Sequence, residues 1–249
     1  MSSEYGEPII EITHLEKSFG DNQVLTDFNL TIRRGENVVV LGKSGCGKSV
    51  LIKCIVGLLN YQGGSIKVFG KEIAELNQHA LDELRARIGF VFQSSALYDS
   101  MTVRENLEFS LRRHGKHKTK EEVKMLVEEM LTNVGLLHAI DLMPSELSGG
   151  MRKRIGLARS LVLKPEIVLY DEPTTGLDPI TAKEISNLML LMQQKYNTSS
   201  IIISHDMHCA QLTANRLTVM IDGINYAQGT FNELSSMTDP KVHAFFETI

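Results

Sequence analysis

The 249-residue sequence contains no tryptophan, and aromatic residues of all kinds make up only 6% of it. It has three cysteines, Cys46, Cys54 and Cys209, and no two of them form a C-x-x-C pair. This spacing indicates neither a disulfide framework nor a cysteine-based metal site. A reduced, cytoplasmic setting therefore fits the cysteine content best.

Long apolar runs are also missing. No stretch approaches the ~20 residues that a membrane-spanning helix needs, and Met1–Pro8 is too polar and acidic to resemble a secretory signal. If the protein acts on a membrane, we therefore expect it to act through another chain. Basic residues are not in excess either. The net charge of -4 and the pI near 6.1 give no general reason to expect nucleic acid as a partner.

Hydrophobic residues make up 43% of the chain, which is enough for a sizeable core in one large α/β domain. Several runs are short, β-branched and apolar, as in strands of a parallel sheet that are buried on both faces. These runs are Val38–Leu41, Ile88–Phe92, Ile167–Tyr170 and Ser200–Ser204. Other strands are expected at Ile9–Phe19, Val24–Ile32, Ser65–Phe69, Leu217–Ile221 and Asn225–Ala227, with a crossover helix at Ala182–Tyr196.

Apolar residues recur at helical spacing between Val103 and about Gly135, so we predict a helical insert within the sheet. The basic stretch Arg112–Lys120 is expected to be a solvated loop. Near the end of the chain, Asp239 and Pro240 are suited to begin a helix. Its apolar stripe would consist of Val242, Phe245, Phe246 and Ile249. Such a stripe needs a surface, either on the chain's own body or on a second copy.

The most informative stretch fits the pattern G-x-x-x-x-G-K-[ST] of a phosphate-binding P-loop. It consists of Gly42, Lys43, Ser44, Gly45, Cys46, Gly47, Lys48 and Ser49. A predicted strand precedes it, and Val50–Gly57 is expected to be a helix. Backbone N–H groups and the helix N-terminus would bind phosphate oxygens. Lys48 would reach the β- and γ-phosphates and Ser49 would bind Mg²⁺. The alternative is a glycine-rich turn that binds nothing.

Two carboxylates, Asp171 and Glu172, follow the predicted strand Ile167–Tyr170. Ligands of parallel α/β sheets bind at the carboxyl ends of the strands, so both side chains are expected beside the P-loop. Asp171 is suited to hold Mg²⁺, directly or through water, and Glu172 to polarise the attacking water. The alternative is a solvated turn.

A second candidate anion site is Leu147-Ser148-Gly149-Gly150, which precedes a predicted helix. One nucleotide does not obviously need two such helix starts from one subunit. The simpler interpretation is a helix cap, because serine is a good N-cap residue.

The order of these motifs resembles the ATP-binding subunits of ABC transporters over nearly the whole chain. The resemblance implies an ABC-type P-loop NTPase fold, with a mostly parallel sheet, an antiparallel N-terminal β part and a helical subdomain. It implies ATP and Mg²⁺ as cofactors and a head-to-tail dimer, in which each ATP lies between one P-loop and the partner's L-S-G-G. Ser148, Gly149 and Gly150 would then bind the ATP of the second copy.

By the same resemblance, four further residues receive roles. Phe19 would stack on adenine, where a tyrosine is usual in the family. Gln93 would sense Mg²⁺ and the attacking water, Asp178 would lie at the dimer seam among the ATP-binding residues, and His205 would contact the γ-phosphate. The alternative for His205-Asp206-Met207-His208 is a metal site, but no fourth ligand is apparent.

The resemblance also divides the chain, as one ABC ATPase domain over residues 1–249. Residues of about 1–93 and 160–228 would form the RecA-like and β core. Residues 94–159 would form the helical subdomain with the signature motif, and residues 229–249 a C-terminal helical tail.

Several phrases, among them Gln93–Met101 and Leu142–Glu146, are similar to the ATPase subunits of Mla-type systems, which move phospholipids between bacterial membranes. We therefore expect a peripheral ATPase subunit at the cytoplasmic face of the inner membrane. Its expected partners are a second copy, a membrane permease and an anchored lipid-binding subunit. The stretch Thr174–Leu177 instead resembles the corresponding stretch of ordinary ABC importers, so an ATPase of a small-solute importer is an alternative. A soluble ABC protein acting on ribosomes or DNA is a second alternative, disfavoured by a single motif set and the absence of a basic face.

Overall fold

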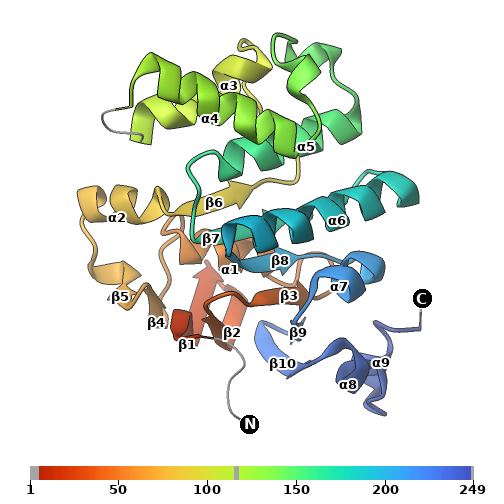
Figure 1. Ribbon diagram of the computed structural model, residues 1–249. Helices are drawn as coiled ribbons and strands as arrows, with labels where there is room; N and C mark the ends of the chain where they lie inside the picture. The colour runs from red at the N-terminus through yellow and green to blue at the C-terminus, as the bar shows by residue number, and fades with distance from the viewer. Residues whose placement is uncertain (1–5, 115–117, 248–249) are drawn as a thin grey trace.

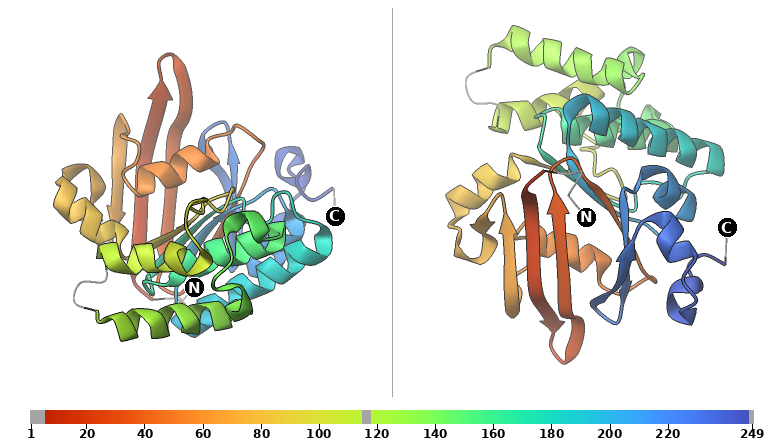
Figure 2. Two further views of the ribbon diagram at one scale, coloured as in Figure 1. Left: turned by 90° about the horizontal axis from the view of Figure 1, so that it is seen from above. Right: turned by 60° about the horizontal axis from the view of Figure 1, so that its bottom comes forward.

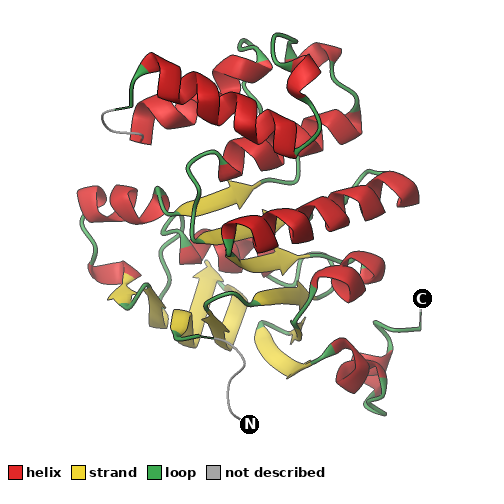
Figure 3. Ribbon diagram, in the orientation of Figure 1, coloured by secondary structure: helices red, strands yellow, loops and turns green. Residues whose placement is uncertain are grey.

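The computed structural model of the protein describes residues 6–114 and 118–247. Among these residues, ten strands form one sheet in the order β5-β4-β1-β2-β10-β9-β3-β8-β7-β6. Figure 3 shows the strands running through the middle of the molecule, with helices gathered at the top and on the flanks. The predicted α/β fold is confirmed.

The sheet has a parallel part and an antiparallel part. The parallel part contains β6 (Ile88–Val91), β7 (Ile167–Asp171), β8 (Ser199–Ile203), β3 (Asn37–Leu41) and β9 (Arg216–Ile221). In the other part, β1 (Pro8–Phe19) and β2 (Asn22–Arg33) form a long hairpin that reaches away from the helices (Figure 2). The remaining strands are β4 (Gly63–Val68), β5 (Lys71–Glu72) and β10 (Ile224–Gly229).

Strand β3 joins two hydrophobic cores, because its side chains alternate between the faces of the sheet. Val38 and Val40 belong to the core that includes α1 (Lys48–Ile55) and the β1–β2 hairpin. Val39 and Leu41 belong to the other core, which includes side chains of α3 to α9, the helices that follow β6 in the chain. All five residues of β3 are buried. Coverage of both faces explains why the predicted buried strands read as continuous apolar runs.

The helices form two groups in Figure 1. Those near the sheet are α1, α2 (Gln78–Arg85), α6 (Pro179–Tyr196), α7 (Met207–Thr213), α8 (Phe231–Ser235) and α9 (Pro240–His243). The upper group comprises α3 (Val103–His114), α4 (Lys120–Asn133) and α5 (Gly149–Leu161), with short 3-10 turns at Leu137–Ala139 and Pro144–Glu146. A further 3-10 turn lies at Ile73–Glu75.

The prediction of a loop over Arg112–Lys120 is wrong at both ends. Arg112, Arg113 and His114 form the last turn of α3, and Lys120 begins α4 after the capping box of Thr119 and Glu122. Basic side chains in a last turn interact favourably with the helix dipole, so a basic run does not indicate a loop. Residues 115–117 of the predicted loop lie outside the described residues.

Helix α2 was absent from the prediction, because its sequence is mostly polar. Asn77 caps it by accepting a hydrogen bond from the N–H of Ala80 at 2.9 Å. Of its eight residues, only Leu84 is buried. A helix with only one buried side chain has little apolar periodicity from which it could be predicted.

The C-terminal helix begins as predicted, with Asp239 as N-cap and Pro240 in the first turn. Val242 and Phe246 are buried against the chain's own body, and the Phe246 ring packs edge-on against Phe231 at 5.4 Å. The chain's own body therefore covers these two residues of the predicted stripe. Ile249 lies outside the described residues.

No helix within residues 6–114 and 118–247 combines the length and apolarity that a membrane crossing requires.

Two glycines with positive φ should differ in how much stability is lost on substitution by alanine, because β4 approaches β1 closely at only one of them. A Cβ on Gly64 (φ 86°) would lie 2.3 Å from the carbonyl oxygen of His14, whereas one on Gly70 (φ 73°) would meet nothing within 4 Å. We expect Gly70→Ala to cost about 1–2 kcal/mol from backbone strain alone. Gly64→Ala should cost clearly more, as measured by urea unfolding. Equal losses in the two variants would contradict this account.

Candidate functional site

The P-loop joins the end of β3 to the first turn of α1, at the carboxyl edge of the parallel strands. Gly47, which caps α1, has φ 107°, and a Cβ there would lie 3.0 Å from both the side chain and the carbonyl oxygen of Val24. Only glycine fits this position without strain. The local geometry therefore explains the second glycine of the motif.

The Lys48 ammonium folds back into the loop. It donates hydrogen bonds to the carbonyl oxygens of Gly42 at 2.6 Å and Lys43 at 3.0 Å, and the side chain is almost completely buried. An ammonium has three donors. The loop thus fixes the position of the charge while leaving one donor for an anion.

Ser49 and Asp171 meet across the start of α1 and the end of β7. The Ser49 hydroxyl donates to the Asp171 carboxylate at 3.0 Å. Burial raises the pKa of Asp171; the Ser49 hydrogen bond opposes this shift and the neighbouring Glu172 charge adds to it. A hydroxyl and a carboxylate side by side supply the oxygen ligands that Mg²⁺ prefers. The residues present therefore fit the metal expected here.

Glu172 is the residue after Asp171, and its backbone lies in the left-handed region at φ 51°. Its carboxylate lies 2.7 Å from Nδ1 of His205 and accepts a hydrogen bond from Thr175 Oγ1 at 3.2 Å. A non-glycine residue at positive φ stores backbone strain, which concentrates at functional sites. The strands β7 and β8 thus bring Glu172 and His205 into direct contact.

Lys153 is a residue of the site that the sequence did not reveal. Its ammonium, on α5, donates to the backbone oxygen of Gln93 at 2.6 Å and lies 3.5 Å from that of Glu172. Burial lowers the pKa of Lys153, against an opposing effect of the Glu172 charge. Lys153 is the one buried side chain in the basic run Arg152–Arg154, and only its position on the helix distinguishes it.

Of these residues, Gly47, Lys48, Ser49 and Glu172 line a cavity of about 750 Å³, whereas Asp171 and Lys153 lie outside its lining. Gln93, Glu172 and His205 line it together with most of the P-loop. Its wall also contains residues that were not among the predicted site residues: Val24, Leu41, Val50, Thr175, Met207, Ala244 and Phe245. The cavity lies where ligands of parallel sheets bind, as the sequence predicted.

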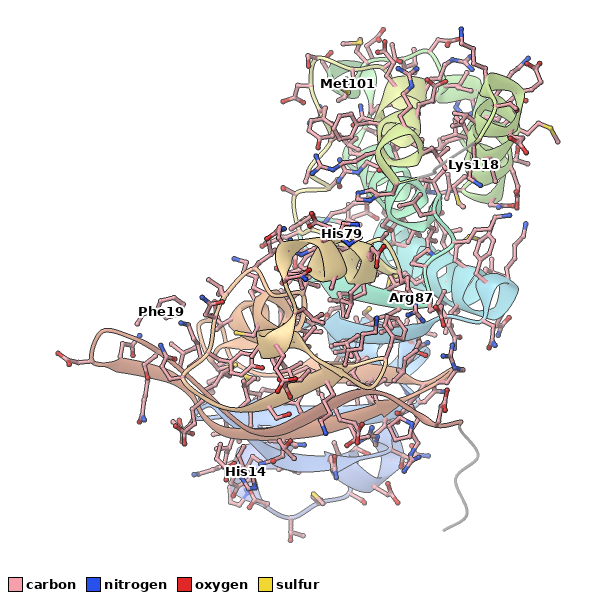
Figure 4. The ribbon with its side chains drawn as sticks, turned by 90° about the vertical axis from the view of Figure 1, so that its left-hand side faces the viewer. His14, Phe19, His79, Arg87, Met101 and Lys118 are labelled. Atoms are coloured by element: carbon pink, nitrogen blue, oxygen red, sulfur yellow. The ribbon has the colours of Figure 1, made fainter. Side chains whose placement is uncertain are left out.

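Phe19 lies outside the lining of this cavity, at the end of β1. Figure 4 shows it near the tip of the hairpin, on the opposite side of the sheet from His14. The ring is 47% exposed, and the ammonium of Lys17 lies 4.6 Å from its centroid. A cation over one ring face leaves the other face open for stacking.

Ser148 and Asp178 both cap helices. Ser148 accepts a hydrogen bond from the N–H of Met151 at 3.3 Å, and Asp178 accepts from the N–H groups of Ile180 and Thr181 at the start of α6. Neither these residues nor Gly149 and Gly150 line the P-loop cavity. One subunit therefore brings most of the predicted site residues to the cavity, whereas Phe19, Asp171, Ser148–Gly150 and Asp178 lie outside its lining.

Asp206 serves as the N-cap of α7, accepting from the N–H groups of His208 and Cys209. It also accepts a hydrogen bond from Thr174 Oγ1 at 2.9 Å. Within the described part of the chain, no group of three or more His, Cys, Asp or Glu side chains is placed to hold a metal ion.

The family model of the ABC transporter matches residues 25–175, which is more than half of the chain. The chain belongs to the ABC transporter family. This stretch includes the P-loop, Gln93, Ser148–Gly150 and both Asp171 and Glu172. The chain is an ABC ATPase, which binds ATP with Mg²⁺ and hydrolyses it.

Relatives with different transport roles are similar to the chain. The probable ribonucleotide transport ATP-binding protein mkl of Mycobacterium tuberculosis is 39% identical over 95% of this chain, which spans only 66% of that protein. The intermembrane phospholipid transport ATP-binding protein MlaF of Haemophilus influenzae is 36% identical, with 96% of this chain and 90% of MlaF covered. The methionine import ATP-binding protein MetN of Campylobacter jejuni is 35% identical, with 95% and 75% covered.

Among solved structures, the ATP-binding cassette MJ0796, a dimer in a post-hydrolysis state bound to ADP and Pi, has a TM-score of 0.81. It is 28% identical, and the match covers 89% of this chain and 98% of that one.

Because the charged carboxylate of Asp171 is partly buried, we expect it to lower the stability of the nucleotide-free protein at neutral pH. A raised pKa means that Asp171 contributes most stability when protonated and loses it as the pH rises through its folded-state pKa. We therefore expect Asp171→Asn to raise the melting temperature at pH 7 without nucleotide. The gain should shrink as the pH falls toward 4.

Glu166→Gln is the matched control, with the opposite sign. Burial acts to raise the pKa of Glu166, but hydrogen bonds from Arg34 and Arg87 outweigh it and lower the pKa overall. Its stabilising effect is present at neutral pH and is lost as the pH falls, so this variant should melt at a lower temperature at pH 7. A lower melting temperature for Asp171→Asn as well would refute the proposed desolvation cost.

Proposed function

We propose that the chain is the ATP-hydrolysing subunit of an ABC transporter, and that two copies close on ATP to drive a separate membrane permease. The observation that carries the proposal is the contact between Glu172 and His205 at the cavity beside the P-loop. Both side chains line the same cavity as Lys48, which supports roles for them beside the terminal phosphate of a bound nucleotide. The dimeric state of MJ0796 with ADP and Pi supports this assignment.

The phosphates would be held by the backbone N–H groups of Gly42–Gly47 and by the ammonium of Lys48. Ser49 and Asp171, with Gln93 nearby, would hold Mg²⁺, which supplies charge neutralisation at the phosphates when bound. Phe19 would stack on adenine with the ring face that Lys17 leaves open.

Glu172 would accept a proton from the attacking water, and His205 would hold the carboxylate in place. Oε2 of Glu172 already interacts with His205 and Thr175, so the side chain is oriented before a water molecule approaches. The Lys153 ammonium contacts the backbone oxygens of both Gln93 and Glu172. A displacement of either backbone would therefore move Lys153 and, through it, the other residue.

The position of Ser148–Gly150 supports dimerisation. This helix start has free N–H groups that suit an anion, yet it lies away from the chain's own cavity. In a head-to-tail pair it would face the ATP of the second copy, with Asp178 at the seam. Two complete sites would then require two subunits.

For the transported substrate, we propose a phospholipid, with the subunit at the cytoplasmic face of the inner membrane beside a permease and an anchored lipid-binding subunit. MlaF, the relative covered most completely of the three described, supports this assignment. A small-solute importer is the second candidate, favoured by the similarity to MetN. Identification of lipid bound to the purified membrane complex would decide between the two.

Glu172→Gln should stop hydrolysis while leaving ATP binding intact. Losing a general base costs about 10²–10⁴ in rate, and dimers with trapped ATP should accumulate on size-exclusion chromatography. Lys48→Ala provides the contrast, because it removes the charge that faces the phosphates and should weaken ATP binding itself. Parental ATPase activity in Glu172→Gln would show that another residue polarises the water.

The permease would dock at Gln93–Met101, between the sensing glutamine and α3. Leu97 is half-buried and packs against the helical core, so it is not free to bind a partner. Tyr98 is 43% exposed, and its ring lies 4.9 Å from that of Phe109. The amide of Asn106 accepts from the N–H of Tyr98 and donates to its carbonyl oxygen, which fixes the loop.

Tyr98→Ala should therefore reduce copurification with the membrane permease and abolish transport, while the isolated subunit still binds ATP. The control is Met125→Ala, which changes an exposed apolar side chain on α4. Normal assembly and transport with Tyr98→Ala would exclude this docking site.

A further inference from the structure

The C-terminal segment reaches the nucleotide site of its own subunit. Ala244 and Phe245 line the same cavity as Lys43, Ser44 and Gly45 of the P-loop. These two residues directly follow α9, about 200 positions after the P-loop in the sequence. Figure 1 shows α8 and α9 below α7, the helix whose first residue, Met207, also lines the cavity.

Contacts on both sides hold this segment in place. Before it, the Asp239 carboxylate accepts a hydrogen bond from the Tyr226 hydroxyl at 2.9 Å, and Val242 is 1% exposed. After it, Phe246 is buried against Phe231. The N–H of Phe245 donates to the carbonyl oxygen of Val242 at 3.1 Å. The position of Phe245 is therefore fixed by its neighbours.

Phe245 itself is only half-buried, although its neighbours Val242 and Phe246 are buried. One part of its side chain packs on the core that contains Met207, and another part faces the cavity. Because burying a phenylalanine ring completely would stabilise the fold, a ring left partly open at a cavity indicates that a ligand contacts it.

We propose that Phe245 is a nucleotide-site residue, and that docking of the C-terminal segment and binding of MgATP strengthen each other. The proposal rests on the assignment of the P-loop cavity to ATP. An apolar ring on the cavity wall excludes water beside the phosphates, and charge interactions such as that of Lys48 are stronger where water is excluded. Linkage then requires that bound MgATP stabilise the docked segment by the same factor.

The first test is the affinity of the full-length chain for MgATP, measured by calorimetry. Phe245→Ala should raise the Kd about fivefold or more, the lower end of usual coupling between sites. His243→Ala is the matched control, because this neighbouring side chain is exposed and is not part of the cavity lining. It should keep the parental Kd. A Kd for Phe245→Ala within about twofold of parental would overturn the proposal.

The second test uses the absence of tryptophan from the sequence. Phe245→Trp introduces a single fluorophore at the cavity wall, and MgATP should change its emission. Phe231→Trp places the fluorophore against Phe246, outside the cavity lining, and should respond little. No response from Phe245→Trp, or an equal response from both variants, would overturn the proposal even if Phe245→Ala folds poorly.

Lys48→Ala separates this inference from the assignment on which it rests. If Lys48→Ala binds MgATP as tightly as the parent, the P-loop cavity is not the ATP site, and both fail. If Lys48→Ala loses binding while Phe245→Ala does not, only the role of the C-terminal segment is refuted.

Discussion

Burial of the central parallel strands on both faces is the constraint on which the site depends. The strands β3, β7 and β8 contribute fully or almost fully buried side chains to two separate cores. Strand β8 pairs with both β3 and β7, and the parallel register places the strand ends at Leu41, Asp171 and Ile203 along one edge of the sheet. The P-loop, Glu172 and His205 follow these ends within one or two residues. The hydrophobic cores thus bring together polar groups that are far apart in the sequence.

Such a site holds charged groups in positions that do not favour folding. Asp171 is partly desolvated beside a second carboxylate, Lys48 is buried among backbone carbonyls, and Glu172 has a strained backbone. Each feature costs stability in the free protein, and each has a use once a phosphate and a metal are bound. Charges that are already oriented and partly dehydrated need little rearrangement on binding. The cores on either side of the sheet offset that cost.

The sequence predicted the parallel strands and the P-loop because both follow from local patterns. Continuous apolar runs indicated burial on both faces, and the glycine spacing indicated the loop whose Gly47 adopts φ 107°. Features that depend on tertiary packing were missed. Lys153 looks like one of three basic residues, and only the orientation of α5 turns it toward Gln93. Likewise, the basic composition that begins at Arg112 predicts a loop, although Arg112, Arg113 and His114 extend from the last turn of α3.

The C-terminal segment shows the same limit in another form. Its cap, its proline and its apolar residues could be read locally, but a stripe does not say what covers it. The structure divides the stripe by burial: Val242 and Phe246 are enclosed by the chain's own core, and Phe245 faces the cavity. Because Phe246 and Phe245 are adjacent, the residue that anchors the segment also sets the position of the one at the cavity. Under the proposed role of Phe245, docking and nucleotide binding involve the same short stretch of chain, and the coupling between them acts equally in both directions.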